Sequence, residues 1–105
     1  MYSKYHGCGN DFIVGMYDKN IDYAKFSQKV CNRNTGIGAD GLLIAKVDEN
    51  KEIEMMFYNA DGSRAPMCGN GIRCFAYFCL REKLVDSNEF KINTLSGKMG
   101  IRVLS

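Results

Sequence analysis

The chain has 105 residues, of which 46% are hydrophobic and 25% are charged, and its formal net charge is +2 at pH 7. This length fits one domain with one modest core, and the composition is that of a globular chain, not a disordered one. Lysine and arginine are scattered among the acidic residues, so no basic stripe favours a nucleic-acid or membrane partner. No run approaches the ~20 apolar residues of a membrane span.

The first part of the chain is predicted to contain three strands and one helix. Residues 2–6 (YSKYH) and 12–17 (FIVGMY) are expected to be strands on either side of a glycine-rich loop, and Gly15 suggests a bulge. The run DYAKFSQKVC has helical spacing, with Asp22 as its N-terminal cap. After the loop TGIGADG, the apolar run LLIAKV is expected to be a buried strand.

The second part is predicted to contain another strand, a helix and a hairpin. EIEMMFY is the strand, and the turn sequence NADGS closes it. Residues 69–84 form a helix that is apolar on most faces and therefore buried. FKINTL and MGIRVL form a hairpin joined at Ser96-Gly97-Lys98. The predicted fold class is therefore α+β, with a mostly antiparallel β-sheet wrapped around a central apolar helix.

The cysteines indicate a reducing environment. Their number is odd and no secretion signal precedes them, which favours free thiols in the cytoplasm. No Cys-x-x-C motif occurs and the chain has one histidine, so a metal site has little support. Cys74 and Cys79 lie within the apolar helix and are predicted to be core thiols.

Cys68 differs, because it stands at or just before the start of this helix, in front of Gly69-Asn70-Gly71. The unpaired N–H groups and the positive end of the helix dipole favour a thiolate there. The same N–H groups would bind a carboxylate. The segment therefore offers a reactive thiol beside a carboxylate site, although a small hydrophobic residue that starts a helix explains the pattern equally well.

Three further patterns in the sequence suggest functional sites. Residues 36–41 match the dinucleotide fingerprint G-x-G-x-x-G, but they follow a helix and open a strand, which is the wrong context, so these glycines are expected to serve turns. His6 and Cys8 form a weak candidate for a nucleophile pair, since nothing brings their side chains together. Asn10 and Asp11, in the same loop, are better candidates for polar contacts, and an Asn side chain suits the ammonium and carboxylate groups of an amino acid. Asn59 is a similar case, although turn chemistry alone could explain it.

Four stretches closely resemble the N-terminal half of diaminopimelate epimerase, in that family's order. They are HGCGNDF at 6–12, NRNTGIGADGLL at 32–43, FYNADGSRAPMCGNGIRCFAYF at 57–78 and NTLSGKMG at 93–100. The resemblance implies two similar α+β halves, each a sheet around a central helix, with the active site between them. It implies that residues 1–105 are a single domain, the N-terminal half, and that the C-terminal half is absent.

The resemblance also implies a reaction. The family interconverts LL- and meso-diaminopimelate for lysine and cell-wall biosynthesis, and needs neither pyridoxal phosphate nor metal. Two cysteines face the substrate α-carbon from opposite sides, one as thiolate base and one as thiol acid. Cys68 would be the first of these cysteines. Gly69 and Asn70 would give backbone amides to the α-carboxylate, and Asn10 and Asn59 would hold other polar groups of the substrate.

The chain departs from the family pattern in three places. Some members carry a substrate-contacting glutamine where this chain has Gly41, and a larger aliphatic residue is common where it has Cys8. The family's second catalytic cysteine lies in a later Cys-Gly-Ser/Thr-Gly motif, which does not occur in this sequence. The expected partners are therefore diaminopimelate and the C-terminal half of the enzyme, and the chain alone is expected to be inactive or nearly so.

The sequence is also compatible with other arrangements and functions. Two copies of the chain could pair as a homodimer that places two Cys68 thiols face to face. The same architecture serves racemases of proline, hydroxyproline and histidine, so the substrate could differ. A non-catalytic module would bind amino-acid carboxylates without exchanging a proton. A thiol redox protein is disfavoured, because no resolving cysteine lies at redox-motif spacing.

Overall fold

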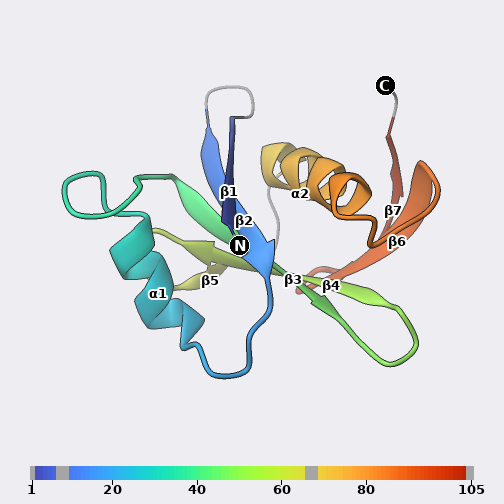
Figure 1. The fold of residues 1–105 in the computed structure, drawn as a ribbon, viewed down its shortest axis with the longest axis horizontal. Coiled ribbons are helices and arrows are strands. Elements are labelled where there is room, and N and C mark those ends of the chain that lie inside the picture. Colours follow the sequence, from blue (N-terminus) through green and yellow to red (C-terminus); the bar gives the residue numbers. More distant parts are fainter. Residues whose placement is uncertain (1, 7–9, 66–68, 104–105) are drawn as a thin grey trace.

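The computed structural model of the chain describes residues 2–6, 10–65 and 69–103, which form one mixed sheet and two helices (Figure 1). The strands are β1 (Tyr2–His6), β2 (Asp11–Met16), β3 (Gly41–Val47), β4 (Ile53–Asn59), β5 (Arg64–Ala65), β6 (Glu89–Thr94) and β7 (Gly97–Arg102). The helices are α1 (Tyr23–Val30) and α2 (Gly69–Arg81). The predicted α+β class is confirmed.

The sheet has the strand order β1-β2-β3-β4-β6-β7. The short β5 pairs with β4 and is not part of this order. β2 pairs with β3 and β4 pairs with β6 in parallel, whereas the remaining pairs are antiparallel. A parallel pair needs a long crossover connection, and a helix lies within each connection here: α1 between β2 and β3, and α2 between β4 and β6.

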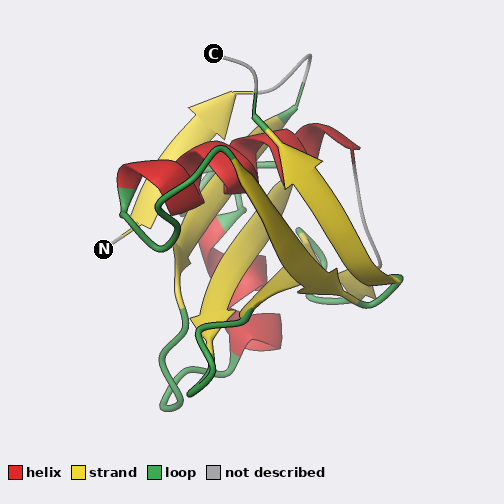
Figure 2. Ribbon diagram, turned by 90° about the vertical axis from the view of Figure 1, so that its right-hand side faces the viewer, coloured by secondary structure: helices red, strands yellow, loops and turns green. Residues whose placement is uncertain are grey.

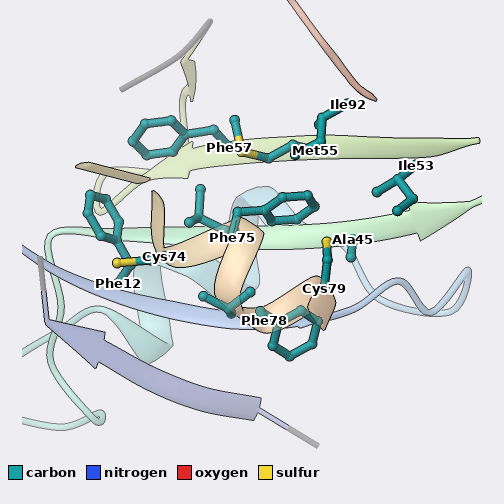
Figure 3. Close-up of a cluster of buried hydrophobic side chains, with 12 residues drawn as sticks. Phe12, Ala45, Ile53, Met55, Phe57, Cys74, Phe75, Phe78, Cys79 and Ile92 are labelled. Carbon is teal, nitrogen blue, oxygen red and sulfur yellow. The ribbon is translucent and has the colours of Figure 1, made fainter. Parts of the chain in front are cut away.

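Each helix packs on one face of the sheet. Successive side chains of a strand point to opposite faces, so the same strands contribute to two separate clusters. We call the buried side chains on one face the α2 cluster, which joins α2 to Phe12, Val14, Leu43, Ala45, Ile53, Met55, Phe57 and Ile92 (Figure 3). The opposite face forms the α1 cluster, in which α1 packs on Ile13, Leu42, Ile44 and Tyr58. This two-sided burial explains why LLIAKV lacks polar alternation. It confirms the strand as buried over Leu42–Ala45, whereas Lys46 and Val47 at its end are exposed.

The prediction for α1 is confirmed at its cap. The Asp22 side chain accepts hydrogen bonds from the backbone N–H groups of Ala24 and Lys25, at 3.1 and 3.3 Å. These bonds satisfy two of the donors that a helix start leaves unpaired. Tyr23 and Val30 are buried on the inner face of this helix.

The helix α2 ends at Arg81, earlier than the predicted Leu84. Lys83 has the left-handed φ of 58°, and its N–H donates to the carbonyl of Leu80 while the N–H of Leu84 donates to that of Cys79. This pair of bonds is the Schellman motif that terminates helices. Glycine usually fills the left-handed position, so a lysine there gave no stop signal in the sequence.

Two further expectations were wrong. Gly15 does not form a bulge, because it pairs in regular register with Tyr2 and Ile44. A Cβ atom there would lie 2.3 Å from Cδ1 of Tyr2, so glycine leaves room for the Tyr2 ring. The hairpin of β6 and β7 is confirmed, but its loop is shorter and earlier than the predicted Ser96-Gly97-Lys98: Thr94 pairs with Gly97, which leaves Leu95 and Ser96 as the two-residue loop.

The helix α2 lies across the strands, between the β1–β2 pair and the β6–β7 hairpin (Figures 1 and 2). Phe75, Phe78 and Cys79 are almost fully buried, whereas Tyr77 on the other side of the helix is 44% exposed. That the sheet wraps around α2 as a central helix stays a prediction. Within the described residues, neither helix is long and apolar enough to cross a membrane.

Candidate active site

Three of the positions singled out in the sequence lie at one end of the sheet. Phe12 of β2 pairs with Gly41 of β3, and Gly41 pairs with Asn59 of β4. Asn10 directly precedes β2. Because these strands are neighbours, Asn10 and Asn59 flank Gly41 at the same end of the sheet, as a shared binding site would require.

The N-terminal end of α2 points toward this end of the sheet. At the far end of the helix, Arg81 donates a hydrogen bond to the hydroxyl of Ser3, near the start of β1. Nearer the helix start, Cys74 shares the α2 cluster with Phe12 (Figure 3). Gly69 and Asn70 open the helix, so their N–H groups belong to the first turn, where backbone donors have no intrahelical partner.

Part of the predicted site lies outside the described residues. Cys68, the predicted catalytic thiol, is one such position, and Cys8 is another. The side chains of His6 and Asn70 are likewise not described, although both residues belong to described elements of backbone. The weak His6–Cys8 pair therefore stays untested.

Asn59 is held in the turn that its sequence predicted. Its side-chain amide donates to the Ser63 hydroxyl at 3.0 Å, and its backbone N–H donates to the Ser63 carbonyl at 2.8 Å. The Ser63 hydroxyl and N–H both donate to the Asp61 carboxylate, and these hydrogen bonds hold the pKa of Asp61 below its ordinary value. The turn therefore fixes the orientation of the Asn59 side chain at the end of β4.

Asn10 belongs to a polar network that sequence reasoning missed. The carboxylate of Asp40 accepts hydrogen bonds from the Asp11 backbone N–H at 2.9 Å, from the Arg33 guanidinium at 3.1 Å and from the Asn10 side-chain amide at 3.4 Å. The bond from Asp11 is the main cause that holds the pKa of Asp40 below its usual range. Arg33 also lies 3.5 Å from the Asp11 carboxylate. Asn10 and Asp11 lie 30 and 29 positions from Asp40 in the chain, and the parallel β2–β3 pairing brings them together.

The glycines of residues 36–41 serve turns and close contacts, as predicted. Gly38 has a φ of 86°, in the left-handed region that favours glycine. A Cβ atom on Gly41 would lie 2.7 Å from Cε1 of Phe57. Any side chain at this position would therefore require the Phe57 ring to move.

The cysteines within the described residues are buried thiols. Cys74 and Cys79 are 4% and 0% exposed, which confirms them as core residues, and Cys31 is 3% exposed. Burial raises the pKa of Cys79 to about 12, and it also raises the pKa of Cys31. A thiol rather than a thiolate is therefore favoured at both positions, and neither is suited to act as a base at neutral pH.

Alkylation will test this assignment. We expect iodoacetamide at mildly alkaline pH to leave Cys31, Cys74 and Cys79 unmodified in the folded chain and to label all three in guanidinium chloride, with peptide mass spectrometry as the readout. The same burial links folding to pH. Because folding raises the pKa of the Cys79 thiol, the contribution of this protonated thiol to the free energy of unfolding is present below the ordinary cysteine pKa and is lost as the pH rises toward about 12. Rapid labelling of Cys79 under native conditions would show that α2 is not stably packed.

Comparison with protein families gives a match over almost the whole chain. The model described as diaminopimelate epimerase matches residues 2–105. A diaminopimelate epimerase of Caldanaerobacter subterraneus subsp. tengcongensis is 45% identical over 91% of this chain, and one of Alkaliphilus metalliredigens is 47% identical over 97%. The chain spans 35% and 37%, respectively, of the lengths of these two relatives.

Solved structures share the fold at lower sequence identity. A phenazine biosynthesis protein of the PhzF family from Enterococcus faecalis has a TM-score of 0.70 and 14% identity, and the match covers 91% of this chain and 35% of that one. A PhzC/PhzF protein from Clostridium difficile has a TM-score of 0.65 and 21% identity, and the match covers 88% of this chain and 33% of that one. At these identities the likeness shows the fold alone.

Proposed function

Because this chain belongs to the diaminopimelate epimerase family, we propose that it supplies one half of an active site that interconverts LL- and meso-diaminopimelate. The observation that carries the proposal is the family match over residues 2–105, which includes the NADGS and MCGNGIRC segments. The common placement of Asn10, Asn59 and the start of α2 at one end of the sheet supports it.

In the proposed site, Cys68 exchanges a proton with the substrate α-carbon. It precedes Gly69 in sequence, next to the first turn of α2, whose N–H groups and dipole favour an anion. The backbone amides of Gly69 and Asn70 bind the α-carboxylate, and they stabilise the negative charge that develops as the α-proton leaves. Asn10 and Asn59 bind other polar groups, including the distal amino-acid end of the substrate.

The proposed reaction follows a two-base scheme. A thiolate removes the α-proton from one face, and a second cysteine thiol delivers a proton to the opposite face, so the configuration inverts without movement of the substrate. The reaction needs neither pyridoxal phosphate nor a metal, as the resemblance implies. Among the described cysteines, Cys31, Cys74 and Cys79 are buried, so none of them suits the role of the second base.

The proposal therefore includes a partner. The sequence has no Cys-Gly-Ser/Thr-Gly motif, and the chain spans about a third of its relatives. We propose that residues 1–105 are the N-terminal domain of a cytoplasmic two-domain enzyme, in which a C-terminal half supplies the second cysteine and the complete sheet encloses α2 as a central helix. A homodimer that places two Cys68 thiols face to face is the alternative arrangement.

Proton NMR tests this function. In H2O, we expect LL-diaminopimelate to bind the reduced chain and to shift the ¹⁵N-edited amide signals of the first turn of α2. In D2O, the chain alone should cause no loss of the substrate α-proton signal. L-Lysine, which lacks the distal carboxylate, should bind more weakly. Adding the C-terminal half of a relative, such as the Alkaliphilus metalliredigens epimerase, should start α-proton loss and formation of the meso isomer.

The variants separate the possible outcomes. Cys68→Ala should abolish the α-proton exchange in the reconstituted sample. Cys31→Ala removes a buried thiol from the α1 cluster and should leave the α-proton exchange unchanged. Exchange by the chain alone that depends on Cys68, in a sample that sediments as a dimer, would favour the homodimer. Failure of diaminopimelate to bind, or equal binding of proline, would contradict the proposed substrate.

A further inference from the structure

The clearest feature outside the proposed catalytic groups is the way Asp40 ties two loops together. The parallel pairing of β2 and β3 starts at Phe12 and Gly41. Just before this pair, the Asp40 N–H donates to the Asp11 carbonyl at 2.9 Å, and the Asp11 N–H donates to the Asp40 carboxylate at 2.9 Å. The Asp40 side chain thus continues the contact between the two strands where the regular ladder stops.

The same carboxylate oxygen reaches Asn10. Oδ2 of Asp40 accepts both the Asp11 N–H and the Asn10 side-chain amide, the latter at 3.4 Å. A hydrogen bond to an ionised acceptor is stronger than a neutral one. Asp40 therefore orients the Asn10 amide through its Nδ2 group and fixes the backbone next to it.

Positive charge keeps this carboxylate in place. Nη2 of Arg33 lies 3.1 Å from Oδ1 of Asp40, on the oxygen that does not contact Asn10. Nη1 of Arg33 lies 3.5 Å from the Asp11 carboxylate, which Lys4 approaches to 3.9 Å. Exposed ion pairs contribute little stability by themselves. Their effect here is on orientation: Arg33 binds Oδ1 of Asp40, which leaves Oδ2 to accept from Asn10 and Asp11.

We propose that Asp40 is a positioning residue for substrate recognition, which holds the Asn10 side chain and the start of β2 in the geometry that binds diaminopimelate. This inference rests on the proposed function, in which Asn10 contacts the substrate. Asp40 itself does not contact the substrate. Its role is to orient Asn10. Removing the Asp40 carboxylate should therefore lower the affinity for the substrate only while the Asn10 amide is present.

A double-mutant cycle measured by NMR titration tests the proposal. LL-diaminopimelate is titrated into the ¹⁵N-labelled chain and into Asp40→Ala, Asn10→Ala and the double variant, with thermal unfolding recorded for each. Residues that act through one another give non-additive effects. We expect Asp40→Ala to weaken binding about tenfold in the parent chain and less than about twofold in the Asn10→Ala background.

A matched control separates positioning from general stability. Asp48 is also an exposed aspartate that accepts backbone N–H groups, those of Asn50 and Glu52, but it lies in the turn between β3 and β4. Asp48→Ala should leave both the affinity and the Asn10 side-chain amide signals unchanged, whereas Asp40→Ala should shift those signals. Asp40→Asn, which keeps an oxygen acceptor but no charge, should restore part of the affinity.

The outcomes distinguish this inference from the proposed function. Unchanged affinity in Asp40→Ala, or losses that add fully in the double variant, would overturn the positioning role while diaminopimelate binding itself stands. Absence of binding by the parent chain would overturn the proposed function and, with it, this inference. A non-additive loss together with shifted Asn10 signals supports both.

Discussion

Replacing Phe75 with alanine is expected to destabilise the fold by about 3–5 kcal/mol, because deletion of a fully buried aromatic ring removes its burial and leaves a cavity. Phe75 is 0% exposed and lies in the α2 cluster, where it contributes to joining α2 to the sheet (Figure 3). Domains of this size are stable by only about 5–15 kcal/mol. The substitution should therefore remove a large part of the total stability, and with it the support of the first turn of α2.

Urea unfolding followed by circular dichroism measures this effect. The midpoint should fall while the slope with denaturant stays unchanged, as expected when only stability changes. Tyr77→Ala is the matched control, since it removes an aromatic ring from the same helix on a side that is 44% exposed. Equal losses for Phe75→Ala and Tyr77→Ala would contradict the packing of α2 described above.

The second large effect is expected at Gly36, where an alanine should cost roughly 3 kcal/mol through overpacking. A Cβ atom there would lie 2.2 Å from the carbonyl oxygen of Lys29 and 2.9 Å from that of Val30. Both oxygens belong to the last turn of α1, and the Val30 oxygen also accepts the Gly38 N–H. The clash is thus with backbone that is already hydrogen-bonded, and a side-chain rotation cannot relieve it.

Gly100→Ala provides the comparison, because no atom beyond its chain neighbours lies within 4 Å of the Cβ that it would add. Its effect should stay within about 0.5 kcal/mol. Thermal unfolding of the two variants compares them directly, with Gly36→Ala unfolding at the clearly lower temperature. A Gly36→Ala variant as stable as Gly100→Ala would show that the loop after α1 rearranges freely. It would then contradict a fixed position of the Asp40 side chain at the end of this loop.

Local signals in the sequence predicted most of the fold. Asp22 marked the start of α1 because a cap acts on residues next to it in the chain. LLIAKV predicts a buried strand, since a strand covered on both faces carries apolar side chains in succession. The same reasoning found Cys74 and Cys79 as core thiols, because helical spacing determines which side chains share a face.

The errors arose where distant residues or unusual turn residues decide the structure. Gly15 suggests a bulge from the local sequence alone, but the ring that it accommodates, Tyr2, comes from another strand. The sequence does not signal the end of α2, because Lys83 takes the left-handed position that glycine usually fills. The contact of Asp40 with Asn10 depends on the parallel pairing of β2 and β3, which no local pattern specifies.

The two parallel pairings also bear on how the chain folds. β1 and β2, β3 and β4, and β6 and β7 are hairpin neighbours, and isolated hairpins form in roughly 1–10 μs. β2–β3 and β4–β6 can pair only after a helix-containing segment has closed into a loop, which costs entropy before any contact repays it. The β4–β6 ladder joins only Ile53 to Ile92 and Glu54 to Asn93. We therefore expect the slow step of folding to be the docking of the β6–β7 hairpin, at the moment when Ile92 reaches the α2 cluster.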